Sequence, residues 1–100
     1  MAIHAVFGRQ WESFRNLLSN QQRHNLGVLL AIELKTGKLR PGVQRIIVVT
    51  PPPKAAIFVY MHGGALHIVG GHWLRRGEPS ALFLGLVRGD IARIKRRDLP

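Results

Sequence analysis

The residues with the clearest chemistry lie near the end of the chain, in the stretch LVRGDIARIKRRDLP. Guanidinium and ammonium groups bind phosphate, and the planar fork of arginine also stacks on nucleobases. Arg88 ends an apolar run at a glycine, where a sharp strand-to-strand turn would hold its side chain in the open. The sequence therefore predicts a polyanion-binding site, whose candidate residues are Arg88, Gly89, Asp90, Arg93, Lys95, Arg96 and Arg97.

The charge of the whole chain favours the same kind of partner. Its 100 residues include 15 Lys and Arg against 5 Asp and Glu, a net charge of +10. Such an excess favours nucleic acid over a membrane surface, with a generic basic surface as the alternative. The chain has no Cys, no signal-peptide pattern and no apolar stretch of membrane-spanning length. We therefore expect an intracellular protein, nuclear or cytoplasmic, with no membrane partner.

Residue types that support catalysis or metal binding are scarce. The acids are isolated from one another, so no paired-carboxylate active site is visible. The segment His62-Gly63-Gly64 is similar to the oxyanion loop of lipase-like hydrolases, but no G-x-S-x-G nucleophile accompanies it, and a turn is expected. The five-residue spacing of His67 and His72 puts them on opposite faces of any strand, with no Cys or carboxylate nearby. We expect no enzyme activity, no metal and no cofactor. Trp73 fits either base stacking or the core.

The first half of the chain gives two element predictions. In RQWESFRNLLSNQQ the spacing of Trp11, Phe14, Leu17 and Leu18 predicts a short amphipathic helix. In GVLLAIELKTG the alternating apolar residues favour a strand that ends at a glycine turn. A helix capped by Gly37 is the alternative.

The second half reads as β structure. VQRIIVVT stops at three prolines, AAIFVYM follows, HGG has turn chemistry, and ALHIV is a hairpin arm. ALFLGLVR and DIARIKRR are predicted as two further strands separated by Gly89. The alternative is a helix capped by Asp90 with Ile91 and Ile94 on its buried side. The predicted fold is a single domain over residues 1–100, mostly β, with one N-terminal helix and a small, bent, five-stranded barrel.

Two stretches resemble a known family. IELKTGKLRPG is similar to the first signature of the Sm and LSm (Sm-like) RNA-binding proteins, and LGLVRGDIARI is similar to the second. The resemblance implies an Sm-like barrel, and a ring of six or seven subunits with RNA at its central hole. The family's Asp and Asn fall near Val48 and Pro52, so its standard uridine pocket is not expected here. The final turn is also one residue shorter than in the family.

The resemblance gives the leading functional hypothesis: an RNA-binding ring subunit that acts in RNA processing or ribonucleoprotein assembly. Its partners would be single-stranded RNA and other Sm-like subunits, in a homo- or hetero-oligomer closed by pairing of ALFLGLV with IARIKRR of the next subunit. One alternative is a small basic accessory protein, viral or phage, that binds and inhibits a protein partner. The other is a small RNase toxin that uses His and Arg.

Overall fold

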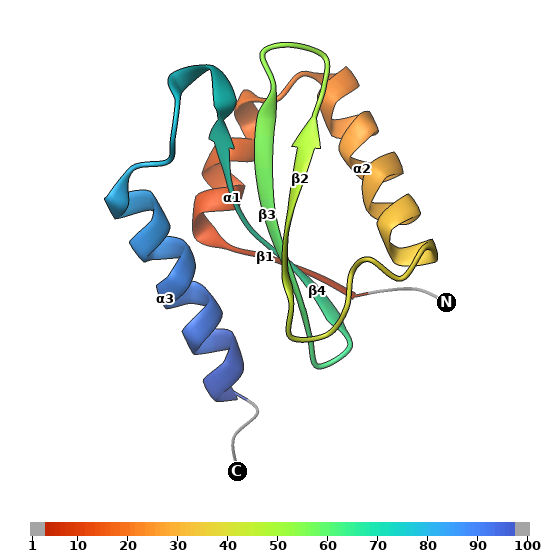
Figure 1. Ribbon diagram of the computed structural model, residues 1–100, viewed down its shortest axis with the longest axis vertical. Coiled ribbons are helices and arrows are strands. Elements are labelled where there is room, and N and C mark those ends of the chain that lie inside the picture. Colours follow the sequence, from red (N-terminus) through yellow and green to blue (C-terminus); the bar gives the residue numbers. More distant parts are fainter. Residues whose placement is uncertain (1–3, 98–100) are drawn as a thin grey trace.

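A four-stranded sheet runs through the middle of the computed structural model, which describes residues 4–97 (Figure 1). Its strands stand in the order β1-β4-β3-β2, and β1 pairs parallel to β4 while the other two pairings are antiparallel. The strands are β1 (His4–Phe7), β2 (Gln44–Val49), β3 (Ala55–His62) and β4 (Ala65–Trp73).

The three consecutive strands form where the sequence predicts them. β2 is rich in β-branched residues and ends just before Pro51, which lacks the N–H needed for a ladder bond. Gly63 and Gly64 both adopt positive φ, and this lets β3 turn directly into β4. The strand predictions for these segments are confirmed, but β4 runs on to Trp73, four residues beyond the predicted ALHIV.

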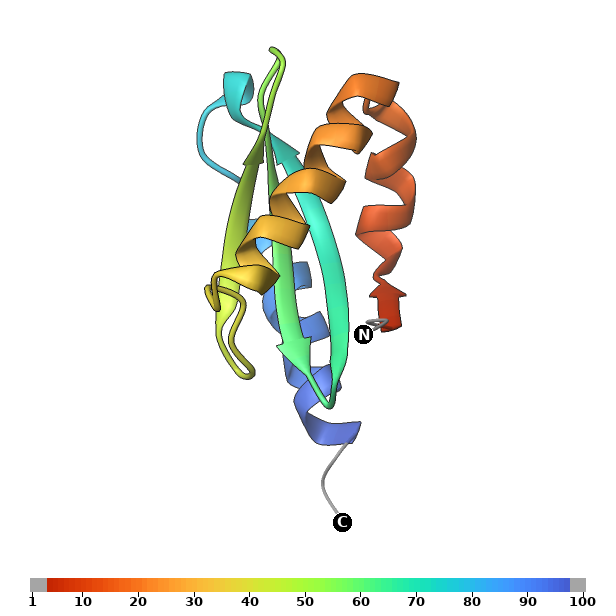
Figure 2. The same ribbon diagram turned by 90° about the vertical axis from the view of Figure 1, so that its right-hand side faces the viewer.

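One face of the sheet is covered by the N-terminal helices, as Figure 2 shows from the side. These are α1 (Arg9–Phe14), which runs on through the 3₁₀ turn Arg15–Leu17, and α2 (Asn20–Lys35). The short helix predicted around Trp11 is therefore confirmed, and Trp11, Phe14 and Leu18 are buried as expected, but Leu17 is exposed. The main core between helices and sheet contains Trp11, Phe14, Leu18, Leu26, Leu30, Leu39, Ile47, Val49, Ala55, Ile57, Val59, Leu66 and Ile68.

α2 replaces the strand that the sequence favours for GVLLAIELKTG, so that prediction is wrong and its helical alternative is right. A capping box starts the helix: Ser19 Oγ accepts from the Gln22 N–H, and Gln22 Oε1 accepts from the Ser19 N–H. At the other end Gly37 takes a φ of 76°, and the N–H of Lys38 donates to the carbonyl of Glu33. Backbone groups at both ends of α2 thus find hydrogen-bond partners nearby. This favours the helix over the strand that the alternating pattern predicts.

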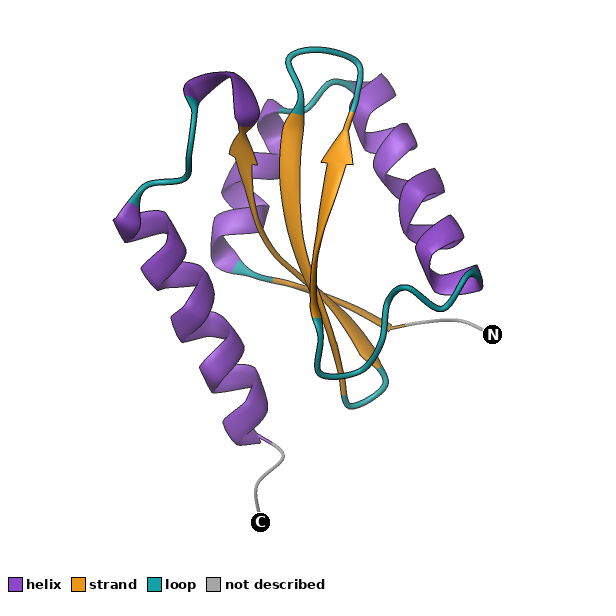
Figure 3. Cartoon of the chain, in the orientation of Figure 1, coloured by secondary structure: helices purple, strands orange, loops and turns teal. Residues whose placement is uncertain are grey.

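The last segment is also helical: α3 (Ala81–Arg97) replaces the two predicted strands (Figure 3). Ser80 precedes it, and its Oγ accepts from the Phe83 N–H at 3.1 Å. The helix passes through Gly89 without a turn, so the predicted sharp turn at Arg88-Gly89 is wrong. Its start at Ala81 also lies well before the Asp90 cap of the alternative.

α3 packs on the opposite face of the sheet from α1 and α2, against β3 and β4 (Figures 1 and 2). Val87 is its buried centre, and the apolar residues of α3 repeat at helical spacing. This second, smaller core contains Ala56, Phe58, Tyr60, Val69 and Val87, with Phe83, Leu84, Ile91 and Ile94 packed around it.

The predicted Sm-like fold is therefore wrong. Residues 4–97 contain three α-helices and an open mixed sheet of four strands, in place of one helix and a five-stranded bent barrel. The expected ring depended on pairing ALFLGLV with IARIKRR, and both segments belong to α3. A ring-shaped oligomer stays a prediction, without that strand exchange as its basis.

Candidate nucleic-acid interface

All seven predicted site residues lie on α3, in its C-terminal half. A helix turns by about 100° per residue, so Arg88, Lys95 and Arg96 fall within one sector of roughly 100°. All three are exposed. Lys95 Nζ lies 5.9 Å from the centre of the Tyr60 ring, which places this sector beside β3. Three cations therefore follow one flank of the helix.

Asp90 and Arg93 lie on the other flank and form an ion pair. The Arg93 side chain is 64% exposed, whereas that of Asp90 is 18% exposed. The Asp90 carboxylate therefore orients the Arg93 guanidinium. Because it is negatively charged, it does not itself bind an anion. That Asp90 is part of an RNA-binding site stays a prediction.

Gly89 and Arg97 complete the predicted set. A methyl group added at Gly89 would meet no atom within 4 Å, so the glycine leaves the helix backbone open to solvent between its charged neighbours. Arg97 is the last residue of α3, and its side chain lies outside the described part of the structure.

The excess of positive charge on α3 is not accounted for by helix stability. The segment 88–97 carries five cations and one acid, which gives it a net charge of +4. Cations in the last turn of a helix interact favourably with its dipole, an effect that fades within one turn. Arg88 lies nine residues before the helix end, beyond the reach of that effect. Helix stability therefore does not explain Arg88, whose exposed guanidinium is hydrated and accessible to an anion.

A β-bulge in β4 decides which faces of the sheet His67 and His72 occupy. Phe58 pairs with Gly70 and Val59 pairs with Ile68, so β4 carries an extra residue between them. As a result His67 and His72 both face α3, and their predicted placement on opposite faces is wrong. The three histidines still do not converge: within residues 4–97 no group of three potential metal ligands exists.

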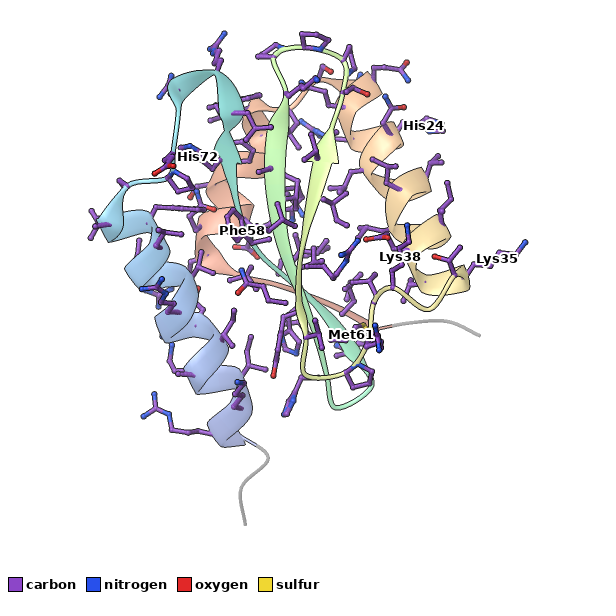
Figure 4. The ribbon with its side chains drawn as sticks, viewed as in Figure 1. His24, Lys35, Lys38, Phe58, Met61 and His72 are labelled. Carbon is purple, nitrogen blue, oxygen red and sulfur yellow. The ribbon has the colours of Figure 1, made fainter. Side chains whose placement is uncertain are left out.

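His72 and Trp73 have structural surroundings. His72 Nε2 lies 2.9 Å from the Gly77 carbonyl, and its ring packs beside Phe83, on the side of the sheet toward α3 (Figure 4). The Trp73 ring lies 4.9 Å from that of Phe14, with the Arg75 guanidinium 5.7 Å away. The core interpretation of Trp73 therefore holds over base stacking.

Sequence reasoning missed one feature, a cavity of about 240 Å³ beside α3. Arg9 from the start of α1 and His67 from β4 line it together with Asp90 and Arg93. The parallel pairing of β1 with β4 brings these residues together, since Val6 stands opposite His67. No local pattern signals this, because the pairing joins segments about 60 residues apart in the chain.

Two further findings bear on the site. Among the helices of residues 4–97, none combines the length and apolar content needed to cross a membrane. The resemblance of two short stretches to Sm and LSm signatures stays a prediction. The chain matches no protein-family model, and no curated protein is similar to it.

Proposed function

We propose that the protein binds single-stranded RNA through the exposed cations of α3 and does not catalyse a reaction. The binding surface, here called the α3 surface, consists of Arg88, Arg93, Lys95 and Arg96. The observation that carries the proposal is the net charge of +4 on segment 88–97, on a helix whose described cations are all exposed. The overall net charge of +10 adds long-range attraction for any polyanion.

The α3 surface has the dimensions of a short phosphate track. Arg88 and Arg96 are eight residues apart, which corresponds to about 12 Å along a helix. A strand laid along this length presents a few successive phosphates to Arg88, Lys95 and Arg96, while Arg93 lies on the other flank of the helix. For a single strand, log affinity falls with log salt at about 0.7 per neutralised phosphate, so three contacts give a slope near −2.

Binding through this surface is expected to depend little on base sequence. α3 contains no Asn, Gln, Ser or Thr, the neutral side chains that read base edges by hydrogen bonding. Arginine and lysine contacts to phosphate position a nucleic acid without reading its sequence. Arg88 sits mid-helix, next to Gly89 and one turn after Gly85, and neither glycine has a side chain that would obstruct a base stacked on its guanidinium.

The double variant Arg88→Ala/Arg96→Ala should weaken binding of a labelled single-stranded RNA about tenfold at 0.15 M salt, because two phosphate contacts are lost. Fluorescence anisotropy over a series of salt concentrations measures both the affinity and the slope. The slope should become shallower by about 1.4, and the loss should be similar for RNAs of different sequence.

A matched control is available at the far end of the molecule. Lys35 and Lys38 lie at the end of α2, away from α3, as Figure 4 shows. Lys35→Ala/Lys38→Ala removes the same charge and should change the affinity less than threefold, through the long-range field alone. Equal losses in both double variants would refute a localised α3 surface. Tighter binding of duplex DNA than of single strands, or cleavage of the labelled RNA, would refute the proposal as stated.

A protein partner is the second candidate, and the open edge of β2 favours it. Within residues 4–97 no strand pairs with the outer edge of β2. In the same strand Ile46 and Val48 are about half exposed, because α3 does not cover them fully. No Lys or Pro interrupts this strand, and Arg45 is held by the Glu33 carboxylate, with Nη2–Oε1 at 2.6 Å. An acidic partner that adds an extended strand here suits both the edge and the net charge. If the wild-type protein shows no salt-dependent binding of RNA, that result would favour the protein partner.

A further inference from the structure

The cavity beside α3 is built by four elements. β1 and the following Gly8 form one wall, β4 the floor, α3 the opposite wall, and the first residue of α1 lies at its rim. Its volume is about 240 Å³.

The charged groups of the cavity come from separate parts of the chain. Arg9 enters from α1, while Arg93 enters from α3 with its guanidinium held by Asp90. His67 is 8% exposed and forms part of the inner wall. The lining therefore carries two guanidinium groups and one carboxylate, the latter already paired.

Arg9 stands at a position where its positive charge destabilises α1. Arg9 is the first residue of α1, where the helix dipole disfavours a cation. Its side chain is exposed and takes part in no described ion pair with Glu12, the acid of the same turn. An anion in the cavity would give this charge a favourable partner.

We infer that the cavity binds a phosphate monoester at the end of a nucleotide chain. The inference rests on the proposed RNA binding, since Arg93 belongs to both the α3 surface and the cavity. A terminal phosphate carries between one and two negative charges near neutral pH, whereas an internal phosphodiester carries one. A cavity whose lining includes two arginines matches the terminal group better, because a guanidinium forms charge-assisted hydrogen bonds with phosphate oxygens.

The size of the cavity agrees with this ligand. Pockets for drug-sized molecules measure about 300–1,000 Å³, and this one falls just below that range. It therefore suits a phosphorylated sugar or a single nucleotide. The lining also includes the apolar residues Val6, Val69 and Ile94, which offer van der Waals contact to the sugar ring.

RNAs of one sequence with a hydroxyl or a phosphate at the 5′ or the 3′ end provide the test. For the wild-type protein, one of the phosphorylated ends should raise the affinity about tenfold over the hydroxyl form. Arg9→Gln should abolish this difference, because Arg9 lies outside the α3 surface and acts only at the cavity. Arg15→Gln is the matched control: the Arg15 guanidinium lies over the Phe7 ring, and Arg15 is not part of the lining. It should leave the difference unchanged.

Free nucleoside monophosphate separates the two proposals. Binding of the monophosphate that depends on Arg9, in a protein that shows no RNA binding, would support the cavity and refute the proposed function. RNA binding that is equal for hydroxyl and phosphate ends, or a phosphate preference that survives Arg9→Gln, would overturn the cavity inference and leave the α3 surface intact. Circular dichroism of each variant confirms that it is folded.

Discussion

Replacing Gln22 with leucine should lower the free energy of unfolding by about 2–4 kcal/mol, although leucine has nearly the same size and higher hydrophobicity. Gln22 is one of the few buried polar residues of the protein, at 3% exposure. Its amide group joins three backbone sites: Nε2 donates to the carbonyls of Pro51 and Pro53, at 3.0 and 2.8 Å, and Oε1 accepts from the Ser19 N–H. Leucine would leave all three without this partner.

The location of these bonds explains the size of the expected effect. The proline loop between β2 and β3 has no regular backbone pairing, so side chains from α2 must satisfy its carbonyls. Asn25 supplies one further bond, to the Thr50 carbonyl. Loss of Gln22 therefore weakens the start of α2 and the loop beneath it together.

Urea unfolding measures this effect, with Gln21→Leu as the matched control. Gln21 is exposed, and its only described bond is to the neighbouring Asn25 side chain. The control should change the free energy of unfolding by less than about 0.5 kcal/mol. A Gln22→Leu protein within 1 kcal/mol of the wild type would contradict the role assigned to this amide.

Gln22 also belongs to the sequence signal that marks the start of α2. Ser19-Asn20-Gln21-Gln22 is a capping-box pattern, which marks the start of α2, and Gly37 marks its end. In the segment between them, apolar residues fit both the period of a strand and that of a helix. The end signals decide the question, because they satisfy backbone groups that a strand would leave to its neighbours.

For α3, the helical spacing of the apolar residues is a stronger signal than the glycine at position 89. The apolar residues Phe83, Leu84, Val87, Ile91 and Ile94 follow helical spacing, and Ser80 begins the pattern. Gly89 suggests a break, but a glycine costs a helix only about 1 kcal/mol, which packing against the sheet offsets. The strands β2, β3 and β4 were predictable because prolines and glycines bound runs of β-branched residues.

The site was predictable in composition but not in arrangement. The sequence alone identifies the cations of segment 88–97. Their distribution over two flanks depends on the helical conformation of α3, which the sequence analysis does not predict. The cavity had no sequence signal: it requires the parallel pairing of β1 with β4 and the packing of α3, both of which join distant segments. Long-range pairing of this kind is set by tertiary packing and not by local pattern.

The substitution of glycine by alanine should have opposite effects at two positions of this chain. At Gly71 in β4, an added Cβ would stand 2.3 Å from Cδ1 of the Phe14 ring. Gly71 cannot move away, because Gln10 holds it on both sides: Oε1 accepts from its N–H at 2.6 Å, and Nε2 donates to its carbonyl at 2.9 Å. Phe14 is itself fixed in the main core against Trp73. Overpacking of this kind costs about 1–3 kcal/mol, and strained Gln10 bonds add to it.

At Gly27, in the exposed middle of α2, the added Cβ would meet no atom within 4 Å. There alanine removes backbone freedom from the unfolded chain and should stabilise the protein by about 0.5–1 kcal/mol. Thermal unfolding should therefore separate the two variants: Gly71→Ala melts roughly 10–20 °C below the wild type, and Gly27→Ala a few degrees above it. A Gly71→Ala protein as stable as the wild type would mean that α1 does not pack on β4 as closely as described. The floor and rim of the cavity depend on the same packing, so that result would weaken the proposed phosphate site as well.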